Sequence, residues 1–82
     1  MVDYQAARAE ILEWLAGTLR VPVDQIELDK PFADIGLDSL DAVHMIATIE
    51  STIQQELPED VIQRVTCLND IFDMMRERLA AA

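Results

Sequence analysis

Apolar residues recur every three or four positions in three separate stretches of this chain, the spacing that places them on one face of an α-helix. The three stretches predict helices over roughly residues 4–19, from Asp38 or Ser39 to Thr52 or Gln54, and from Leu68 to Leu79. A short helix is predicted from Pro58 to Arg64, because proline is tolerated at a first helical position. A chain of 82 residues has room for one domain, residues 1–82. The predicted fold is all-α, with three long helices and one short one.

The segment between the first two helices, residues 21–38, has neither helical nor strand periodicity. Its apolar residues are nevertheless spread along its whole length, between the breakers Pro31 and Gly36. So long a connection in a small domain is usually functional or folded on its own side chains. We therefore expect a long ordered loop that packs across the helices, with a short helical turn around residues 24–28.

The net charge of −10 is concentrated in the middle of the chain. Residues 24–60 contain ten Asp and Glu against Lys30 alone, a net charge of −9. Nucleic acids and anionic membranes are poor partners for such a surface, because both require basic residues to neutralise phosphates. Proteins with basic surfaces are the favoured partners.

Cysteine and targeting signals indicate the compartment. Cys67 is the only cysteine, so no internal disulfide can form and a reducing compartment is expected. Cys67 and His44 are too few ligands for a closed zinc site, and we predict no metal. The N-terminal residues resemble no signal peptide, and no apolar run is long enough to span a membrane. The predicted location is the cytoplasm.

Catalytic groups are not evident in the sequence. His44 follows Ser39 by five positions, about 500° around a helix, so the two cannot pair within that helix. With only Gly17 and Gly36, the chain also lacks a glycine-rich phosphate loop. We therefore predict no catalytic residues and no enzymatic activity.

Ser39 stands where the long loop becomes the second helix, in the sequence Gly36-Leu37-Asp38-Ser39-Leu40. A hydroxyl at a helix N-terminus favours an attached phosphate, because the unpaired N–H groups there accept anions. Asp and Ser are also the commonest N-cap residues, so the pair could serve only as a helix cap. Local spacing leaves both interpretations open.

Residues 32–43, Phe-Ala-Asp-Ile-Gly-Leu-Asp-Ser-Leu-Asp-Ala-Val, resemble the attachment region of acyl carrier proteins, with its G-x-D-S-L motif. The resemblance extends over nearly the whole chain and implies a four-helix bundle of acyl-carrier type. It also implies that Ser39 carries a 4′-phosphopantetheine arm derived from coenzyme A, whose thiol holds acyl groups as thioesters. Cys67 would then be a half-buried packing residue. The protein would be a non-catalytic substrate of a phosphopantetheinyl transferase.

The same resemblance implies a docking face on the second helix for basic patches of partner enzymes. These partners would be the transferase, a ketosynthase, an acyltransferase and other acyl-processing enzymes, bound transiently by a monomeric carrier. Acidic contacts would come from Asp38, Asp41 and Glu50, apolar contacts from Leu40, Val43 and Ala47, and a further contact from His44. The acyl chain would enter a pocket formed by Met45, Ile46, Ile49 and Ile53.

Three positions depart from the pattern of fatty-acid carriers. His44 stands where glutamate is common, and Ser51 and Thr52 stand where acids are frequent. The carrier would serve a fatty-acid-like or polyketide-like pathway, and the departures favour a polyketide-like or other specialised acyl pathway over housekeeping fatty acid synthesis. Two alternatives remain. One is a stand-alone peptidyl carrier of a nonribosomal system, although such carriers usually have Gly-Gly-His-Ser or Gly-Gly-Asp-Ser where this chain has Gly36-Leu37-Asp38-Ser39. The other is a small acidic helical adaptor in which Ser39 is only a cap.

Overall fold

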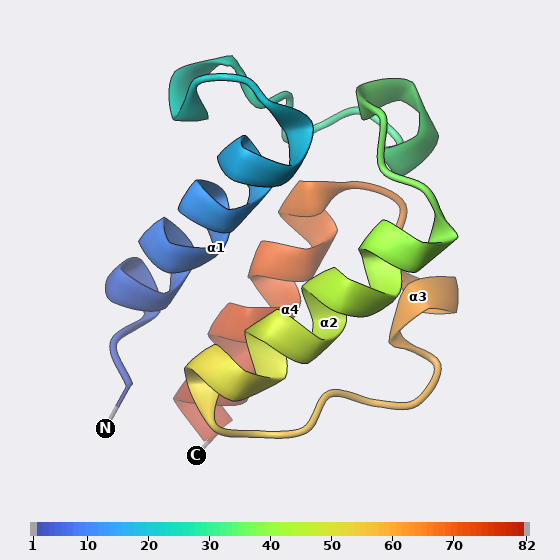
Figure 1. Ribbon diagram of the computed structural model, residues 1–82. Helices are drawn as coiled ribbons and strands as arrows, with labels where there is room; N and C mark the ends of the chain where they lie inside the picture. The colour runs from blue at the N-terminus through green and yellow to red at the C-terminus, as the bar shows by residue number, and fades with distance from the viewer. Residues whose placement is uncertain (1, 82) are drawn as a thin grey trace.

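The computed structural model describes residues 2–81, and within that range the chain forms four α-helices (Figure 1). Their bounds are α1 Tyr4–Leu19, α2 Ser39–Ile53, α3 Val61–Arg64 and α4 Leu68–Ala81. No β-strand occurs among the described residues, apart from one isolated bridge between Pro31 and Cys67. The predicted all-α fold, with three long helices and one short one, is confirmed. None of the helices described is long and apolar enough to cross a membrane.

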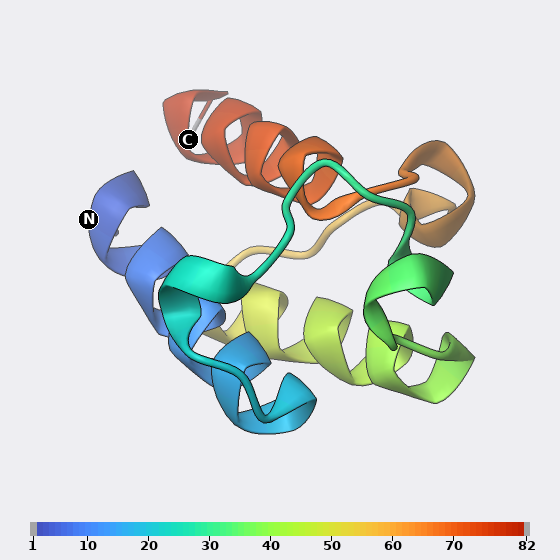
Figure 2. The ribbon, with the colours of Figure 1, turned by 90° about the horizontal axis from the view of Figure 1, so that it is seen from above.

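The core lies between α1, α2 and α4, which surround it on three sides (Figures 1 and 2). Each long helix buries the residues that recur at three- and four-residue spacings, as the sequence predicts. The buried residues are Ala7, Ile11, Leu12 and Leu15 from α1, Ala42, Met45, Ile49 and Ile53 from α2, and Leu68, Ile71, Phe72 and Met75 from α4. Removal of this apolar surface from water is the main force that stabilises the fold.

Two arginines connect α1 with α4 through aromatic rings. The guanidinium of Arg8 lies 5.1 Å from the centre of the Phe72 ring, and that of Arg76 lies 4.8 Å from the centre of the Tyr4 ring. Cation–π contacts of this length are worth about 0.5–1 kcal/mol at exposed sites. They hold the first helix against the last.

The loop before α2 crosses the ends of the helices, and its apolar side chains pack against the core, as predicted (Figure 2). It contains two 3₁₀ turns, η1 at Val23–Gln25 and η2 at Phe32–Ile35. The predicted turn at residues 24–28 corresponds to η1, one residue earlier and shorter, whereas η2 was not predicted. Backbone hydrogen bonds fasten the loop to the C-terminal part of the chain: Asn69 N–H to Leu28 O (2.9 Å) and Phe32 N–H to Thr66 O (3.2 Å).

The short helix begins later than the sequence predicts. Pro58 was expected at its first position, but α3 starts at Val61. The N–H of Val61 donates to the carbonyl of Pro58 over 3.1 Å, so residues 58–61 form a turn that precedes the helix. Helical hydrogen bonding begins only at Asp60, whose carbonyl accepts from the N–H groups of Gln63 (2.9 Å) and Arg64 (3.2 Å), so Pro58 precedes the helix.

The start of α4 provides a test of stability against pH. Asp70 Oδ2 accepts hydrogen bonds from the N–H groups of Thr66 (2.9 Å) and Cys67 (3.4 Å), and these bonds, that of Thr66 first, lower the pKa of the Asp70 carboxyl below its ordinary value. Because the folded pKa is the lower one, the stabilisation is complete above the unfolded pKa of about 3.9 and is lost as the pH falls through the folded pKa. Asp70→Asn should therefore unfold at lower urea concentration than wild type at pH 7, and the difference should shrink in strong acid. An equal difference at both pH values would contradict this role.

Candidate phosphopantetheine site and docking face

The approach to α2 is fixed by Gly36 and Leu37. Gly36 has φ of 89°, in the left-handed region that glycine adopts without strain, and ends η2. Leu37 is buried, and its N–H donates to the carbonyl of Phe32 over 3.0 Å. The turn at these two residues places Asp38 at the N-cap position of α2.

Asp38 and Asp41 form a reciprocal cap at the start of α2. Asp38 Oδ1 accepts from the Asp41 N–H (2.8 Å), and Asp41 Oδ2 accepts from the Asp38 N–H (3.4 Å). A capping box of this kind satisfies two backbone donors that a helix start would otherwise leave unpaired. The cap is therefore made by the two aspartates and not by Ser39.

Ser39 is the first residue of α2 and is exposed. Within residues 2–81 its hydroxyl makes no hydrogen bond, since the capping bonds belong to Asp38 and Asp41. The N–H groups of Ser39 and Leu40 belong to the first turn, which has no preceding helical carbonyl to accept them. A phosphate ester on this hydroxyl would lie at the positive end of the α2 dipole and would face solvent, so the residues fit such a group.

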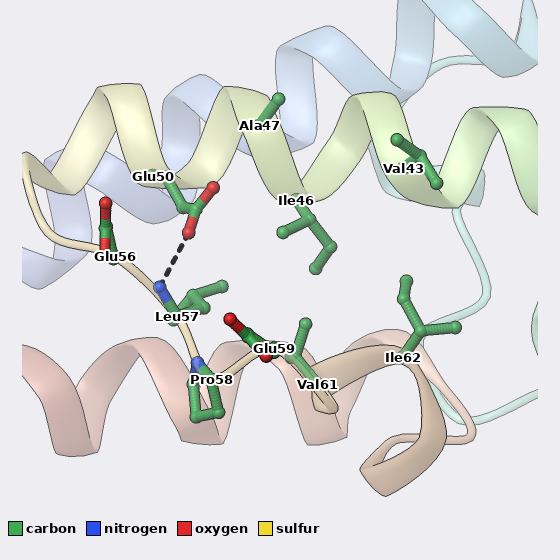
Figure 3. Close-up of a pocket in the computed structure, with 10 residues that line it drawn as sticks. All are labelled: Val43, Ile46, Ala47, Glu50, Glu56, Leu57, Pro58, Glu59, Val61 and Ile62. Carbon is green, nitrogen blue, oxygen red and sulfur yellow. Dashed lines mark hydrogen bonds between the residues drawn. The ribbon is translucent and has the colours of Figure 1, made fainter.

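An exposed apolar group lies next to Ser39. Leu40 is 61% exposed and Val43, three residues later on the same helix face, is 57% exposed. Ile62 of α3 is 39% exposed and lies opposite Val43 (Figure 3). His44 and Ala47 are also exposed, and Asp41 is half-buried. Six of the seven predicted partner-binding residues therefore lie near the serine end of α2 or along its outer face; the exception is Glu50.

Glu50 has contacts that helical periodicity did not reveal. It is half-buried, and its Oε2 accepts a hydrogen bond from the N–H of Leu57 over 2.8 Å (Figure 3). Leu57 is a buried residue in the connection between α2 and α3. Glu50 thus fastens this connection to α2, in addition to any charge that it presents.

A pocket of about 430 Å³ lies between α2 and α3 (Figure 3). We call it the α2–α3 pocket; its lining residues are Val43, Ile46, Ala47, Glu50, Glu56, Leu57, Pro58, Glu59, Val61 and Ile62. Of the four predicted pocket residues only Ile46, which is half-buried, lines it. Met45, Ile49 and Ile53 are buried in the core instead. The lining from residues 56–62 was missed, because the period of one helix does not tell which segment lies across from it.

The acidic charge around α2 is largely unneutralised. The only base in residues 24–60, Lys30, forms an ion pair with Glu27 (2.7 Å), and this hydrogen-bonded contact raises the Lys30 pKa. Arg64 lies 3.9 Å from Asp60. Both pairs are exposed, so they contribute little to stability. Across residues 2–81, no three His, Cys, Asp or Glu side chains are grouped so as to hold a metal ion.

Comparison with known proteins agrees with this geometry. A family model described as a phosphopantetheine attachment site matches residues 9–75. The acyl carrier protein of Guillardia theta is 34% identical over 64 residues, which cover 77% of this chain and 79% of that protein. The acyl carrier protein of Syntrophobacter fumaroxidans is 28% identical over 81 residues, 98% and 100% of the two chains, and that of Clostridium perfringens (strain SM101) is 29% identical over 69 residues, 83% and 91%.

The family match includes the loop, the serine and the α2–α3 pocket, and the relatives are matched over most of their own length. This chain therefore belongs to the acyl carrier proteins, a generally non-catalytic family whose members carry intermediates between acyl-processing enzymes on a covalently attached 4′-phosphopantetheine.

Proposed function

We propose that Ser39 carries the 4′-phosphopantetheine arm and that a phosphopantetheinyl transferase attaches it. The observation that supports this most is that the residues that cap α2 are not the residue that would carry the arm. Asp38 and Asp41 cap the helix, which leaves the Ser39 hydroxyl exposed and unused. A serine needed only as a cap would accept a hydrogen bond from the backbone, and Ser39 does not.

The attachment reaction is a phosphoryl-type transfer from coenzyme A. Ser39 Oγ forms a bond to the phosphorus nearest the pantetheine, and the bond from that phosphorus to adenosine 3′,5′-bisphosphate breaks. The hydroxyl proton passes to a base of the transferase, since the neighbouring carboxylates of Asp38 and Asp41 are engaged in the helix cap. The thiol at the end of the arm then holds the acyl group as a thioester.

The docking face consists of exposed apolar side chains within an acidic surround. Leu40 and Val43 provide apolar contact on the same face of α2, while Asp38 and Asp41 contribute charge. His44 and Ala47 extend the face along α2. We infer that basic patches on the transferase, a ketosynthase and an acyltransferase bind here, quickly and with marked dependence on salt, because exposed charges act mainly on the rate of encounter.

A test of attachment requires coenzyme A, a promiscuous phosphopantetheinyl transferase and an intact mass. The wild-type protein should gain the mass of one phosphopantetheine. A protein that stays unmodified under conditions that load a control carrier would rule out the proposal. That result would favour the adaptor interpretation instead.

We further propose that the carrier serves a specialised pathway of polyketide-like chemistry. His44 and Ser51 are exposed and Thr52 is half-buried, so the outer surface of α2 has neutral side chains at positions where acids are frequent in fatty-acid carriers. A partner enzyme that fits this surface would require fewer basic residues opposite the middle and end of α2. The distribution of charge, rather than its total, would then select the partner.

His44→Glu tests the idea of a specialised docking face. The variant should exchange acyl groups faster with a general fatty-acid synthase and more slowly with the carrier's own synthase, because a negative charge is added where only the former has a basic counterpart. His44→Gln, which keeps the residue neutral, should resemble wild type. Initial rates at two salt concentrations measure the effect. No change with either synthase would contradict the proposal.

A further inference from the structure

We propose that the hydrogen bond between Glu50 and Leu57 closes the far end of the α2–α3 pocket and thereby limits the length of acyl chain that the carrier shelters. The inference rests on the proposed function, since the chain in question is the one held on the arm of Ser39. It assigns to Glu50 a role in chain-length specificity rather than in docking alone.

The pocket extends away from Ser39 along α2. Val43 is four residues after Ser39 and Glu50 is seven residues after Val43, a rise of about 10 Å along the helix between these two. Val43 and Ile62 lie at the end nearer Ser39, whereas Glu50 and Leu57 lie at the other end (Figure 3). An acyl chain that enters beside Val43 therefore advances toward Glu50.

Apolar side chains provide surface in the middle of the pocket. Ile46 from α2 and Val61 from α3 point into the space between the two segments, with the Glu59 side chain beside Val61 (Figure 3). Each methylene that leaves water for such a surface raises the ratio of inserted to solvent-exposed chain about fourfold. Chain insertion is thus favoured over the stretch from Val43 to Val61.

The far end of the pocket is polar, and a hydrogen bond spans it. The Leu57 N–H donates to Glu50 Oε2 over 2.8 Å, and Leu57 itself is only 7% exposed. An alkyl chain cannot replace the carboxylate as an acceptor, so pushing it aside would leave a backbone N–H without a partner in an enclosed place. Glu56 and Glu59 also line the pocket, and their carboxylates offer no apolar surface against which a longer acyl chain could be buried.

The experiment uses a series of acyl groups from butyryl to dodecanoyl, transferred with the arm from acyl-coenzyme A by a promiscuous transferase. The quantity measured is the melting temperature of each acylated form minus that of the unacylated arm-bearing form of the same variant. This difference cancels any general loss of stability caused by a substitution. In wild type it should rise with chain length and then level off.

Glu50→Ala should move that plateau to a longer acyl chain, because the closing hydrogen bond and the carboxylate are both absent. Glu56→Ala is the matched control, since it removes the same charge from the pocket lining but leaves the Glu50–Leu57 bond in place; its plateau should stay where it is in wild type. Glu50→Gln keeps a side-chain oxygen that can accept from Leu57 and should also retain the wild-type plateau. A plateau that does not move in Glu50→Ala, or that moves equally in Glu56→Ala, overturns the inference.

Amide hydrogen exchange of Leu57 in the wild-type protein gives a second readout that needs no variant. The Leu57 amide should stay protected with chains both shorter and longer than the plateau length, because a longer chain stops at the Glu50–Leu57 bond. Faster exchange of this amide with longer chains would mean that the bond gives way and would overturn the inference. Continued protection together with continued stabilisation by longer chains would also overturn the inference. If the wild-type protein acquires no arm, the proposed function fails. If the arm attaches but the plateau lies at the same chain length in wild type and in Glu50→Ala, only this inference fails.

Discussion

Ser39→Ala is expected to acquire no phosphopantetheine at all, whereas Ser51→Ala should be modified at the wild-type rate. Ser39 and Ser51 are the only serines of the chain, and both are exposed residues of α2. Only Ser39 stands at the start of the helix, next to the cap formed by Asp38 and Asp41. Intact mass after incubation with coenzyme A and a transferase measures the effect.

The fold of both serine variants should stay intact, because the Ser39 hydroxyl makes no hydrogen bond within the described chain and alanine is well tolerated in a first helical turn. Far-ultraviolet circular dichroism with urea unfolding checks this point. Modification of a folded Ser39→Ala variant would disprove the assignment of the attachment residue.

Ile49→Ala should cost about 2–5 kcal/mol in free energy of unfolding, the usual loss when a buried isoleucine is truncated. Ile49 has no exposed surface and lies on the core side of α2. Small domains have only about 5–15 kcal/mol of stability, so the variant should lose a large fraction of its free energy of unfolding. Urea titration followed by circular dichroism gives the free energy.

Ile46→Ala provides the comparison on the same helix. Ile46 is half-buried and lines the α2–α3 pocket, so its truncation removes less buried surface and leaves no enclosed cavity. Its loss of stability should be clearly smaller than that of Ile49→Ala. Equal losses would mean that the division between core and pocket residues on α2 is incorrect.

The long helices could be predicted from the sequence because their information is local. The three- and four-residue spacing of apolar side chains fixes both the extent of each helix and its buried face. The bounds of α1 agree with the prediction, in spite of Gly17 near its end, because the helix is held by packing of Ile11 and Leu15 rather than by propensity.

The details of the loops depend on contacts between residues that are far apart in the chain. The hydrogen bonds from Asn69 to Leu28 and from Phe32 to Thr66 join segments separated by more than thirty residues, and no local sequence pattern predicts such bonds. The sequence predicts Pro58 at the first position of the short helix, whereas the structure places Pro58 in the turn before it, with helical hydrogen bonds starting at the Asp60 carbonyl.

The candidate site was predictable in its position but not in its internal contacts. The sequence places Ser39 at the start of a helix, yet only the structure shows that the aspartates at 38 and 41 take the cap. Glu50 was expected on the docking face, and periodicity does place it on α2. Its bond to Leu57 requires the connection after α2 to fold back, which a helical period cannot indicate.

The attachment of the arm to Ser39 is tested most directly by locating the added mass within the chain. Arg20 and Arg64 are consecutive arginines, so a protease that cuts after arginine releases residues 21–64 as one peptide containing both serines. Fragmentation of this peptide from the modified wild-type protein should assign a single phosphopantetheine to Ser39. Assignment to Ser51, to a threonine or to Cys67 elsewhere in the chain would contradict the account.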